Sequence, residues 1–253
     1  MKVTVLGSNA GGPSRSNPAS GYLVEADGHR MWLEAGPGTF MLLASMMDPR
    51  DLDCVVLSHT HVDHCADLFA LFAYLAYGSS PRDPVPVFAP VGTGEKFGTF
   101  IGAGEGHPFH SVFTFVEQQP GMEGSCGPFA MRFGTAVHPV PALVTRIDAG
   151  GAVLVYSGDT GPGGDLIELA TGAATLLCEA GIQGLRDAET YPYHLTAFEA
   201  GETAAIAGVF DLVLTHLAAN LDPQISIDEA SGAFVGPIIH AAPGTTFTVR
   251  TTE

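Results

Sequence analysis

The feature that most constrains this chain is a cluster of histidines between two apolar segments. Three histidines and one aspartate fall within six consecutive positions, in the string Ser58-His59-Thr60-His61-Val62-Asp63-His64. The string follows Cys54–Leu57, which is short, apolar and rich in β-branched residues, as a buried strand is. It precedes Ala66–Tyr77, whose apolar residues recur at helical spacing. The histidines are therefore predicted to lie where a strand ends and a helix begins.

These side chains have the chemistry and the spacing of metal ligands. In an extended segment alternate side chains share a face, so His59 and His61 can bind one cation. Asp63 and His64 begin the next turn and can face a second cation beside the first. The alternative is that Asp63 caps the helix and the histidines are incidental. Three clustered imidazoles would contribute little to apolar packing, and this favours the metal site.

Three more polar residues stand where predicted apolar strands end. They are His138 at the end of Thr135–His138, Asp159 after Ala152–Ser157 and His216 after Leu212–Thr215. Functional side chains are commonly placed on the loops of a rigid strand scaffold. Each residue alone is an ordinary loop residue, but together with the first cluster they predict a larger metal centre.

In this order the residues resemble the ligand set of the metallo-β-lactamase superfamily, over nearly the whole chain. The resemblance implies two zinc ions, one held by His59, His61 and His138, the other by Asp63, His64 and His216. Asp159, whose carboxylate has two oxygens, is implied to bridge both. Two ions held in this way would clamp an anionic substrate and generate hydroxide near neutral pH. Sites of histidine and carboxylate also accept Mn²⁺ or Fe²⁺.

A second pair of residues indicates one branch of that superfamily. Glu179 lies in an apolar segment, and His194 follows it by fifteen residues. The two segments resemble the acidic and histidine motifs of the phosphodiesterase branch that includes ribonuclease Z, although Cys178 stands where that branch often has histidine. The resemblance implies that Glu179 orients His194, which protonates the leaving oxygen or stabilises its charge. It also implies that Asp63 orients the nucleophile or accepts its proton. The alternative is a helix-capping pair at a loop.

The substrate is predicted to be small. Only 21 positions separate His138 from Asp159, where ribonuclease Z typically inserts a tRNA-binding arm. The formal net charge is −17 and the chain has only two lysines, so it would repel a nucleic acid. The strings Tyr156-Ser157-Gly158-Asp159-Thr160-Gly161 and Leu214-Thr215-His216 resemble actinobacterial-type cyclic nucleotide phosphodiesterases. That resemblance implies hydrolysis of a small anionic phosphodiester, with 3′,5′-cyclic AMP as the expected substrate, and a homodimer.

Other activities on this fold stay open. They are tRNA 3′ processing in the manner of ribonuclease Z, and hydrolysis of a lactone or thioester. A non-catalytic binding protein is the remaining class, but such chains tend to lose ligands and all seven are present here.

The order of predicted elements favours an α+β fold. Strands are predicted over Lys2–Leu6, Tyr22–Glu25, Met31–Glu34, Cys54–Leu57, Val85–Ala89, Phe113–Glu117, Phe129–Phe133, Thr135–His138, Leu143–Ile147, Ala152–Ser157, Thr175–Glu179, Leu212–Thr215 and Thr246–Thr251. Helices are predicted over Phe40–Met47, Ala66–Tyr77, Gly94–Ile101, Asp165–Ala170 and Thr196–Ala207. Strand pairs and strands alternating with helices occur in both halves, which predicts an αββα four-layer sandwich of two mixed β-sheets with helices outside. No linker or repeat divides residues 1–253, so we expect a single domain.

Composition supplies the remaining expectations. No run of about 18 apolar residues is present, so we expect no membrane association, and the first residues are typical of a strand rather than a signal peptide. Four cysteines without CxxC spacing are typical of free thiols in a reducing compartment, and we expect a cytoplasmic protein.

Weaker predictions concern the rim of the site. Gln118–Gly127 is expected to be a mobile border of the pocket. Phe109, Phe113 or Tyr193 is a candidate to stack on a base. Arg146 is expected either to approach a phosphate or to pair with Asp148.

Overall fold

The strands form two mixed β-sheets that pack face to face. The computed structural model describes residues 1–78 and 82–252. In spatial order the first sheet contains β14 (Thr246–Thr248), β1 (Lys2–Gly7), β2 (Gly21–Ala26), β3 (His29–Leu33), β4 (Cys54–Val56), β5 (Val85–Pro90) and β6 (Phe113–Gln118). The second contains β13 (Ile238–His240), β12 (Asp211–Thr215), β11 (Thr175–Glu179), β10 (Ala152–Tyr156), β9 (Leu143–Ala149), β8 (Phe129–Thr135) and β7 (Glu123–Cys126).

Each sheet is antiparallel at one end and parallel at the other. Strands β14 to β3 and β7 to β10 pair antiparallel. Strands β3 to β6 and β10 to β13 pair parallel. Parallel neighbours require crossover connections, and helices supply many of these.

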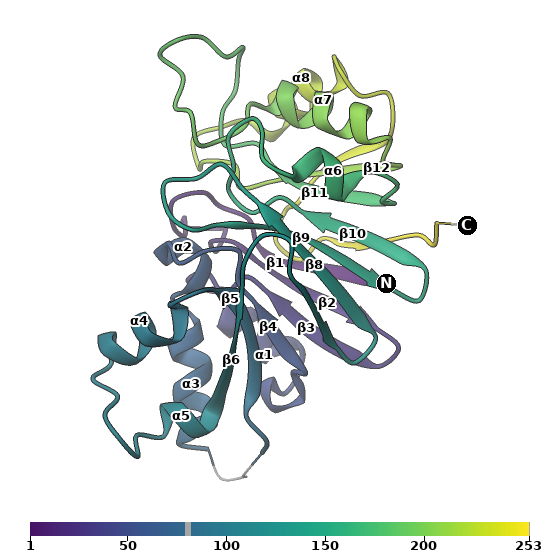
Figure 1. Ribbon diagram of the computed structural model, residues 1–253. Helices are drawn as coiled ribbons and strands as arrows, with labels where there is room; N and C mark the ends of the chain where they lie inside the picture. The colour runs from purple at the N-terminus through teal and green to yellow at the C-terminus, as the bar shows by residue number, and fades with distance from the viewer. Residues whose placement is uncertain (79–81, 253) are drawn as a thin grey trace.

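Helices cover the outer face of each sheet, which gives four layers (Figure 1). On the first sheet lie α1 (Thr39–Met46), α3 (Leu68–Ala76), α4 (Thr93–Phe100) and α5 (Phe109–Val112), with the short α2 (Val62–Cys65) and the 3₁₀ turn Pro49–Asp51 nearby. On the second lie α6 (Leu166–Ala170), α7 (Ala197–Ala207) and α8 (Pro223–Ser231). The predicted α+β sandwich is confirmed.

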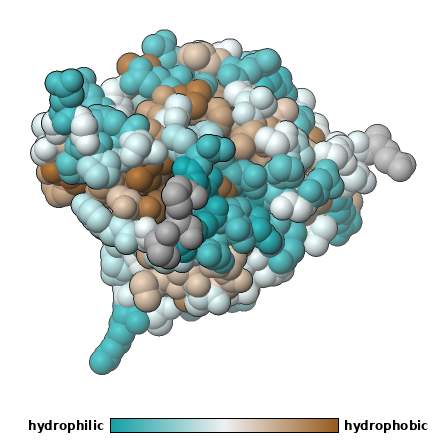
Figure 2. Space-filling model, turned by 90° about the horizontal axis from the view of Figure 1, so that it is seen from below, coloured by the Kyte–Doolittle hydropathy of each residue, from teal (hydrophilic) through white to brown (hydrophobic). Residues whose placement is uncertain are grey.

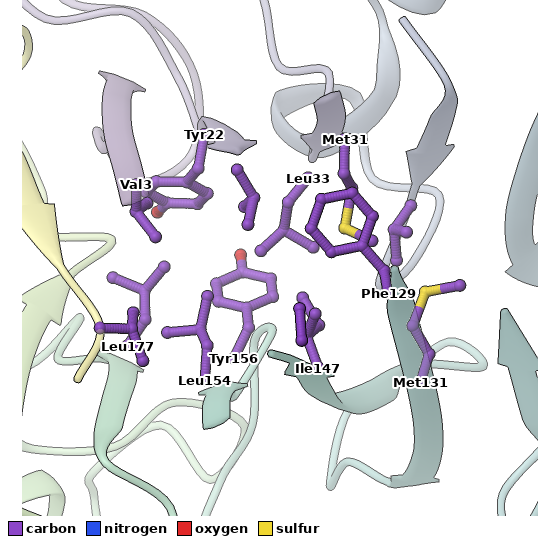
Figure 3. Close-up of a cluster of buried hydrophobic side chains, with 14 of the residues drawn as sticks. Val3, Tyr22, Met31, Leu33, Phe129, Met131, Ile147, Leu154, Tyr156 and Leu177 are labelled. Carbon is purple, nitrogen blue, oxygen red and sulfur yellow. The ribbon is translucent and has the colours of Figure 1, made fainter. Parts of the chain in front are cut away.

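The central core lies between the sheets. Side chains from the two inner faces meet there, as Figure 3 shows for Tyr22 on β2 and Tyr156 on β10. The two rings pack with centroids 5.5 Å apart. Because a β-strand points alternate side chains to opposite faces, the apolar strands also supply the two outer cores beneath the helices.

The face on which α3 and α5 lie mixes hydrophilic and hydrophobic residues (Figure 2). Within residues 1–78 and 82–252, no helix combines the length and apolarity needed to cross a bilayer.

Two predicted segments differ in the structure. The strand predicted over Thr135–His138 is wrong, because β8 continues through Gly134 and ends at Thr135, and the chain then turns away. Val137 donates its N–H to Thr160 Oγ1 instead of to a strand. The mobile border predicted over Gln118–Gly127 is also wrong in part, because β7 lies within it and pairs with β8.

Three described helices are not among the predicted ones, the single turns α2 and α5 and one longer helix. The longer one is α8, which Asp222 caps by accepting the N–H of Gln224, with Pro223 in its first turn. An aspartate followed by proline is a helix-start signal and was available in the sequence.

Candidate metal centre

The predicted ligands come together where strands of both sheets end. The histidine cluster follows β4 of the first sheet and runs into α2. His138 follows β8, Asp159 follows β10 and His216 follows β12, all in the second sheet. The site therefore lies at one edge of the interface between the sheets.

The first group of donor atoms contains three imidazole nitrogens. His61 Nδ1 lies 3.0 Å from His59 Nε2 and 3.1 Å from His138 Nε2. Asp159 Oδ2 lies 3.7 Å from His59 Nε2. Nitrogen ligands at tetrahedral positions around zinc would be about 3.3 Å apart. These four residues therefore fit a divalent ion of the zinc type.

The second group shares Asp159 with the first. Its donor atoms come from Asp63, His64, Asp159 and His216, all buried, and lie within 4.8 Å of one another. Asp159 Oδ1 lies 3.2 Å from His64 Nε2, and Asp159 Oδ2 lies 3.2 Å from His216 Nε2. Asp63 Oδ2 is 3.6 Å from His64 Nε2. One carboxylate thus faces both groups.

Several of these buried atoms lack a hydrogen-bond partner. Within the described part of the chain, neither ring nitrogen of His64 nor Asp159 Oδ1 has one. Buried polar atoms are nearly always paired in folded proteins. Two of these atoms, His64 Nε2 and Asp159 Oδ1, lie 3.2 Å apart in the second group, where a bound cation would satisfy both.

Electrostatics favour the ligating protonation states of three groups but not of His64, because burial lowers its pKa and the contacts with Asp159 and Glu34 outweigh this and hold the pKa well above its usual value. Burial, reinforced by the neighbouring His64, holds the pKa of His59 well below its usual value. Burial also lowers the pKa of His216 to about 4. Burial opposes ionisation of Asp159, but His216 and His64 outweigh it and hold the pKa of Asp159 well below its usual range. Neutral imidazoles beside an ionised carboxylate are a donor set for a cation.

Other groups orient the ligands. Ser58 Oγ lies 2.9 Å from His59 Nδ1, and Ser20 Oγ lies 3.0 Å from His216 Nδ1. The N–H of Gly11 donates to Asp63 Oδ2 at 2.8 Å. These contacts bring the glycine-rich loop after β1 to the site, and they fix which ring atoms face its centre.

Glu34 was not among the predicted site residues. It is fully buried, its Oε2 lies 3.3 Å from His64 Nδ1, and its Oε1 accepts the N–H of Ser58 at 2.7 Å. Its φ of 62° lies in the left-handed region, which is strained for this residue type. A signal was present, because Glu34 is an acidic residue directly after an apolar strand, like the ligands themselves.

The structure places Glu179 and His194 beside the metal-binding groups. His194 Nδ1 lies 2.9 and 3.2 Å from the two oxygens of Glu179. Glu179 is fully buried, and its Oε1 also accepts the N–H of Thr160 at 2.6 Å. The His194 ring stacks on His216 at 5.5 Å. Burial opposes protonation of His194, but the hydrogen bond to Glu179 raises its pKa above the ordinary value.

Some rim candidates lie elsewhere. Phe109 and Phe113 are buried in the core beneath the first sheet's helices, so their predicted base stacking is wrong. Of the two alternatives for Arg146, pairing with Asp148 is confirmed, with contacts of 3.0 and 3.2 Å. Tyr193 does lie near the site, since its carbonyl is 3.4 Å from His138 Nδ1.

Comparison with known proteins establishes the family. A family model described as a β-lactamase superfamily domain matches residues 29–217. The chain belongs to the metallo-β-lactamase superfamily. The resemblance predicted from the sequence is confirmed at this level.

Three relatives define its neighbourhood in the superfamily. An uncharacterised protein of Mycobacterium leprae is 35% identical over 260 residues, covering 100% of this chain and 90% of that protein. Ribonuclease Z of Mycolicibacterium gilvum is 30% identical, covering 88% of this chain and 86% of that protein. The crystal structure of the metallo-β-lactamase fold protein YhfI from Bacillus subtilis aligns with a TM-score of 0.86 and 28% identity, over 97% of this chain and 98% of that one.

Proposed function

We propose that this metal-dependent hydrolase cleaves a small phosphodiester, with 3′,5′-cyclic AMP as the leading candidate. The observation that supports the proposal is the contact of the Glu179–His194 pair with the two His/Asp groups. Asp159, Glu179 and His194 place donor atoms within 4.8 Å of one another. A histidine oriented by a buried carboxylate is therefore in reach of a substrate held at the metal centre.

The proposal assigns one ion to His59, His61 and His138 and a second to Asp63, His64 and His216, with Asp159 facing both. Two divalent ions at this spacing would supply positive charge to a phosphate and acidify a water near neutral pH. Zinc suits the histidine-rich first group, while Mn²⁺ or Fe²⁺ would be accepted by the same donor types.

The remaining roles belong to side chains that surround the substrate. His194, held by Glu179, donates a proton to the leaving oxygen or stabilises its charge. Asp63, fixed by the Gly11 N–H, orients the attacking water or accepts its proton. Asp159 keeps the two groups together and takes no part as acid or base.

Processing of tRNA 3′ ends is the second candidate, because the Mycolicibacterium gilvum relative is named ribonuclease Z. Two features favour a small substrate instead. The segment between His138 and Asp159 holds the tight hairpin of β9 and β10 and no long insertion. The net charge of −17 opposes a large polyanion.

A direct comparison of substrates tests the proposal. Zinc-reconstituted protein is incubated with 3′,5′-cyclic AMP, with a precursor tRNA that carries a 3′ trailer, and with bis(p-nitrophenyl) phosphate. The expected result is release of AMP with the tRNA intact. Trailer cleavage without turnover of cyclic AMP would replace the proposal with the ribonuclease activity. Hydrolysis of the nitrophenyl ester alone would keep the phosphodiesterase class and reject the cyclic nucleotide.

A further inference from the structure

A cleft of about 640 Å³ opens beside the metal centre. His138 forms part of its wall, so a ligand in the cleft can reach the predicted first metal group. Pro90 and Pro120 line it from the side of β5 and β6, and Pro139 and Pro141 from the segment after β8. Its size is that of pockets that bind small molecules.

The walls suit a flat, uncharged group. Among the described residues that line the cleft there is no aspartate, glutamate, lysine or arginine. Four proline rings make the walls rigid and apolar. A phosphate would find no charged partner here, so the part of a substrate that enters the cleft is its neutral part.

One buried amide lines this apolar cleft. Gln118, the last residue of β6, is only 2% exposed. Alternate residues of a strand share a face, so Gln118 points between the sheets as Val116 does. In the described part of the chain its Oε1 has no hydrogen-bond partner, and its Nε2 has only a long contact of 3.5 Å to the Val116 carbonyl. Burying an amide with so few hydrogen bonds costs folding free energy, unless a ligand supplies the missing partners.

We infer that the cleft binds the base of a nucleotide whose phosphate lies at the metal centre, and that Gln118 selects adenine. A side-chain amide offers an acceptor and a donor side by side. On the edge that carries N7, adenine offers the complementary donor and acceptor in its amino group and N7, whereas guanine offers two acceptors, O6 and N7. The inference rests on the proposed function for the phosphate, and it adds the specificity residue.

Equilibrium binding tests the inference without requiring turnover. Binding of AMP, GMP and ribose 5-phosphate to the zinc-loaded protein is measured by calorimetry. We expect AMP to bind about tenfold more tightly than either GMP or ribose 5-phosphate, as a bidentate amide contact would give. Equal affinity for AMP and ribose 5-phosphate, including no measurable binding of either, would overturn the inference. Tight AMP binding by a protein that does not hydrolyse cyclic AMP would reject the proposed function alone.

Variants assign the effect to the cleft. Gln118→Met keeps the side-chain length and removes the amide, and should abolish the preference for AMP over GMP while leaving ribose 5-phosphate binding unchanged. Gln224→Met makes the same change on the exposed surface of α8 and should change nothing. Val140→Trp narrows the cleft from the side of the loop after β8 and should lower the affinity for AMP about tenfold. This variant still tests the cleft if Gln118→Met fails to fold. Unchanged AMP selectivity in both cleft variants contradicts the inference.

Discussion

At the scale of single residues, the side chains that face the metal centre are fixed through their other polar atoms. Ser58 lies within hydrogen-bond distance of His59 and Ser20 within hydrogen-bond distance of His216, while the Glu34 carboxylate faces His64 Nδ1 at 3.3 Å. A ring whose second nitrogen is bonded has one orientation and one tautomer, which strengthens metal binding. The centre therefore depends on residues that would touch no metal themselves.

Glu34→Gln tests this dependence. The amide can still accept the Ser58 N–H, but it cannot supply the negative charge that faces His64. We expect zinc affinity to fall about 10- to 100-fold, with activity regained at saturating zinc. Competition with a chelating dye measures the affinity. The matched control Glu25→Gln alters a surface glutamate that pairs with Lys2 and should keep wild-type affinity. Equal affinity in both variants would show that Glu34 does not orient His64.

His194 and Asp63 should separate catalysis from metal binding. His194→Ala removes the proposed proton donor but none of the proposed ligands, so we expect turnover to fall about 10²- to 10⁴-fold with zinc content unchanged. Asp63→Ala should lower both. Turnover and metal analysis of the purified variants measure the two effects, and His110→Ala, at an exposed position, is the control. A wild-type rate for His194→Ala would falsify its role.

At the scale of elements, the start of α7 positions the loop that carries His194. Arg186 contacts both oxygens of Glu199, at 2.6 and 2.9 Å, and also donates to the His194 carbonyl. Glu199 forms a capping box with Thr196 at the first turn of the helix. The position of His194, the proposed catalytic histidine, is therefore tied to a helix end as well as to Glu179.

Arg186→Ala should loosen that loop. We expect kcat/KM to fall about 10- to 100-fold, because a small misplacement of a catalytic group is costly. Zinc content should stay at the wild-type level, since Arg186 contacts none of the proposed ligands in the described structure. Arg250→Ala, which removes an exposed arginine stacked on Phe210, serves as the control. Unaltered kinetics would mean that Glu179 alone suffices to hold His194.

At the scale of the whole molecule, the metal centre connects the two sheets. The first sheet contributes the histidine cluster after β4, and the second contributes His138, Asp159 and His216. The Leu143 N–H donates to the Ser58 carbonyl at 3.0 Å and adds a direct link between them. A bound ion should therefore stabilise the packing of one sheet on the other.

Removal of metal should lower the thermal midpoint. A ligand present at about 100 times its Kd adds about 2.7 kcal/mol to the stability. For a chain of this size that corresponds to about 5–10 °C. Calorimetry of the protein with and without chelator measures the shift, and zinc added back, but not calcium, should restore it. An unchanged midpoint after complete metal removal would count against a centre that spans the sheets.

Much of the fold could be predicted because local patterns carry it. Short apolar segments became strands, helical spacing became helices, and polar residues at strand ends met at one site. The errors lie in segments whose local sequence carries no clear strand pattern. Strand β8 continues through Gly134, and β7 (Glu-Gly-Ser-Cys) forms a hairpin with β8 although its residues are mostly polar or small.

By itself, the sequence determined the kind of chemistry, because residue types and their order along the strands name the metal-binding groups. Only the tertiary structure decided which partners complete them. Glu34 meets His64, Arg146 meets Asp148 rather than a phosphate, and Gln118 lines the cleft beside His138. The contact of Glu34 with His64 and the cleft shared by Gln118 and His138 bring together residues that are 20 or more positions apart in the sequence. The first depends on the pairing of β3 with β4 and the second on how the two sheets pack against each other, and no local pattern encodes either.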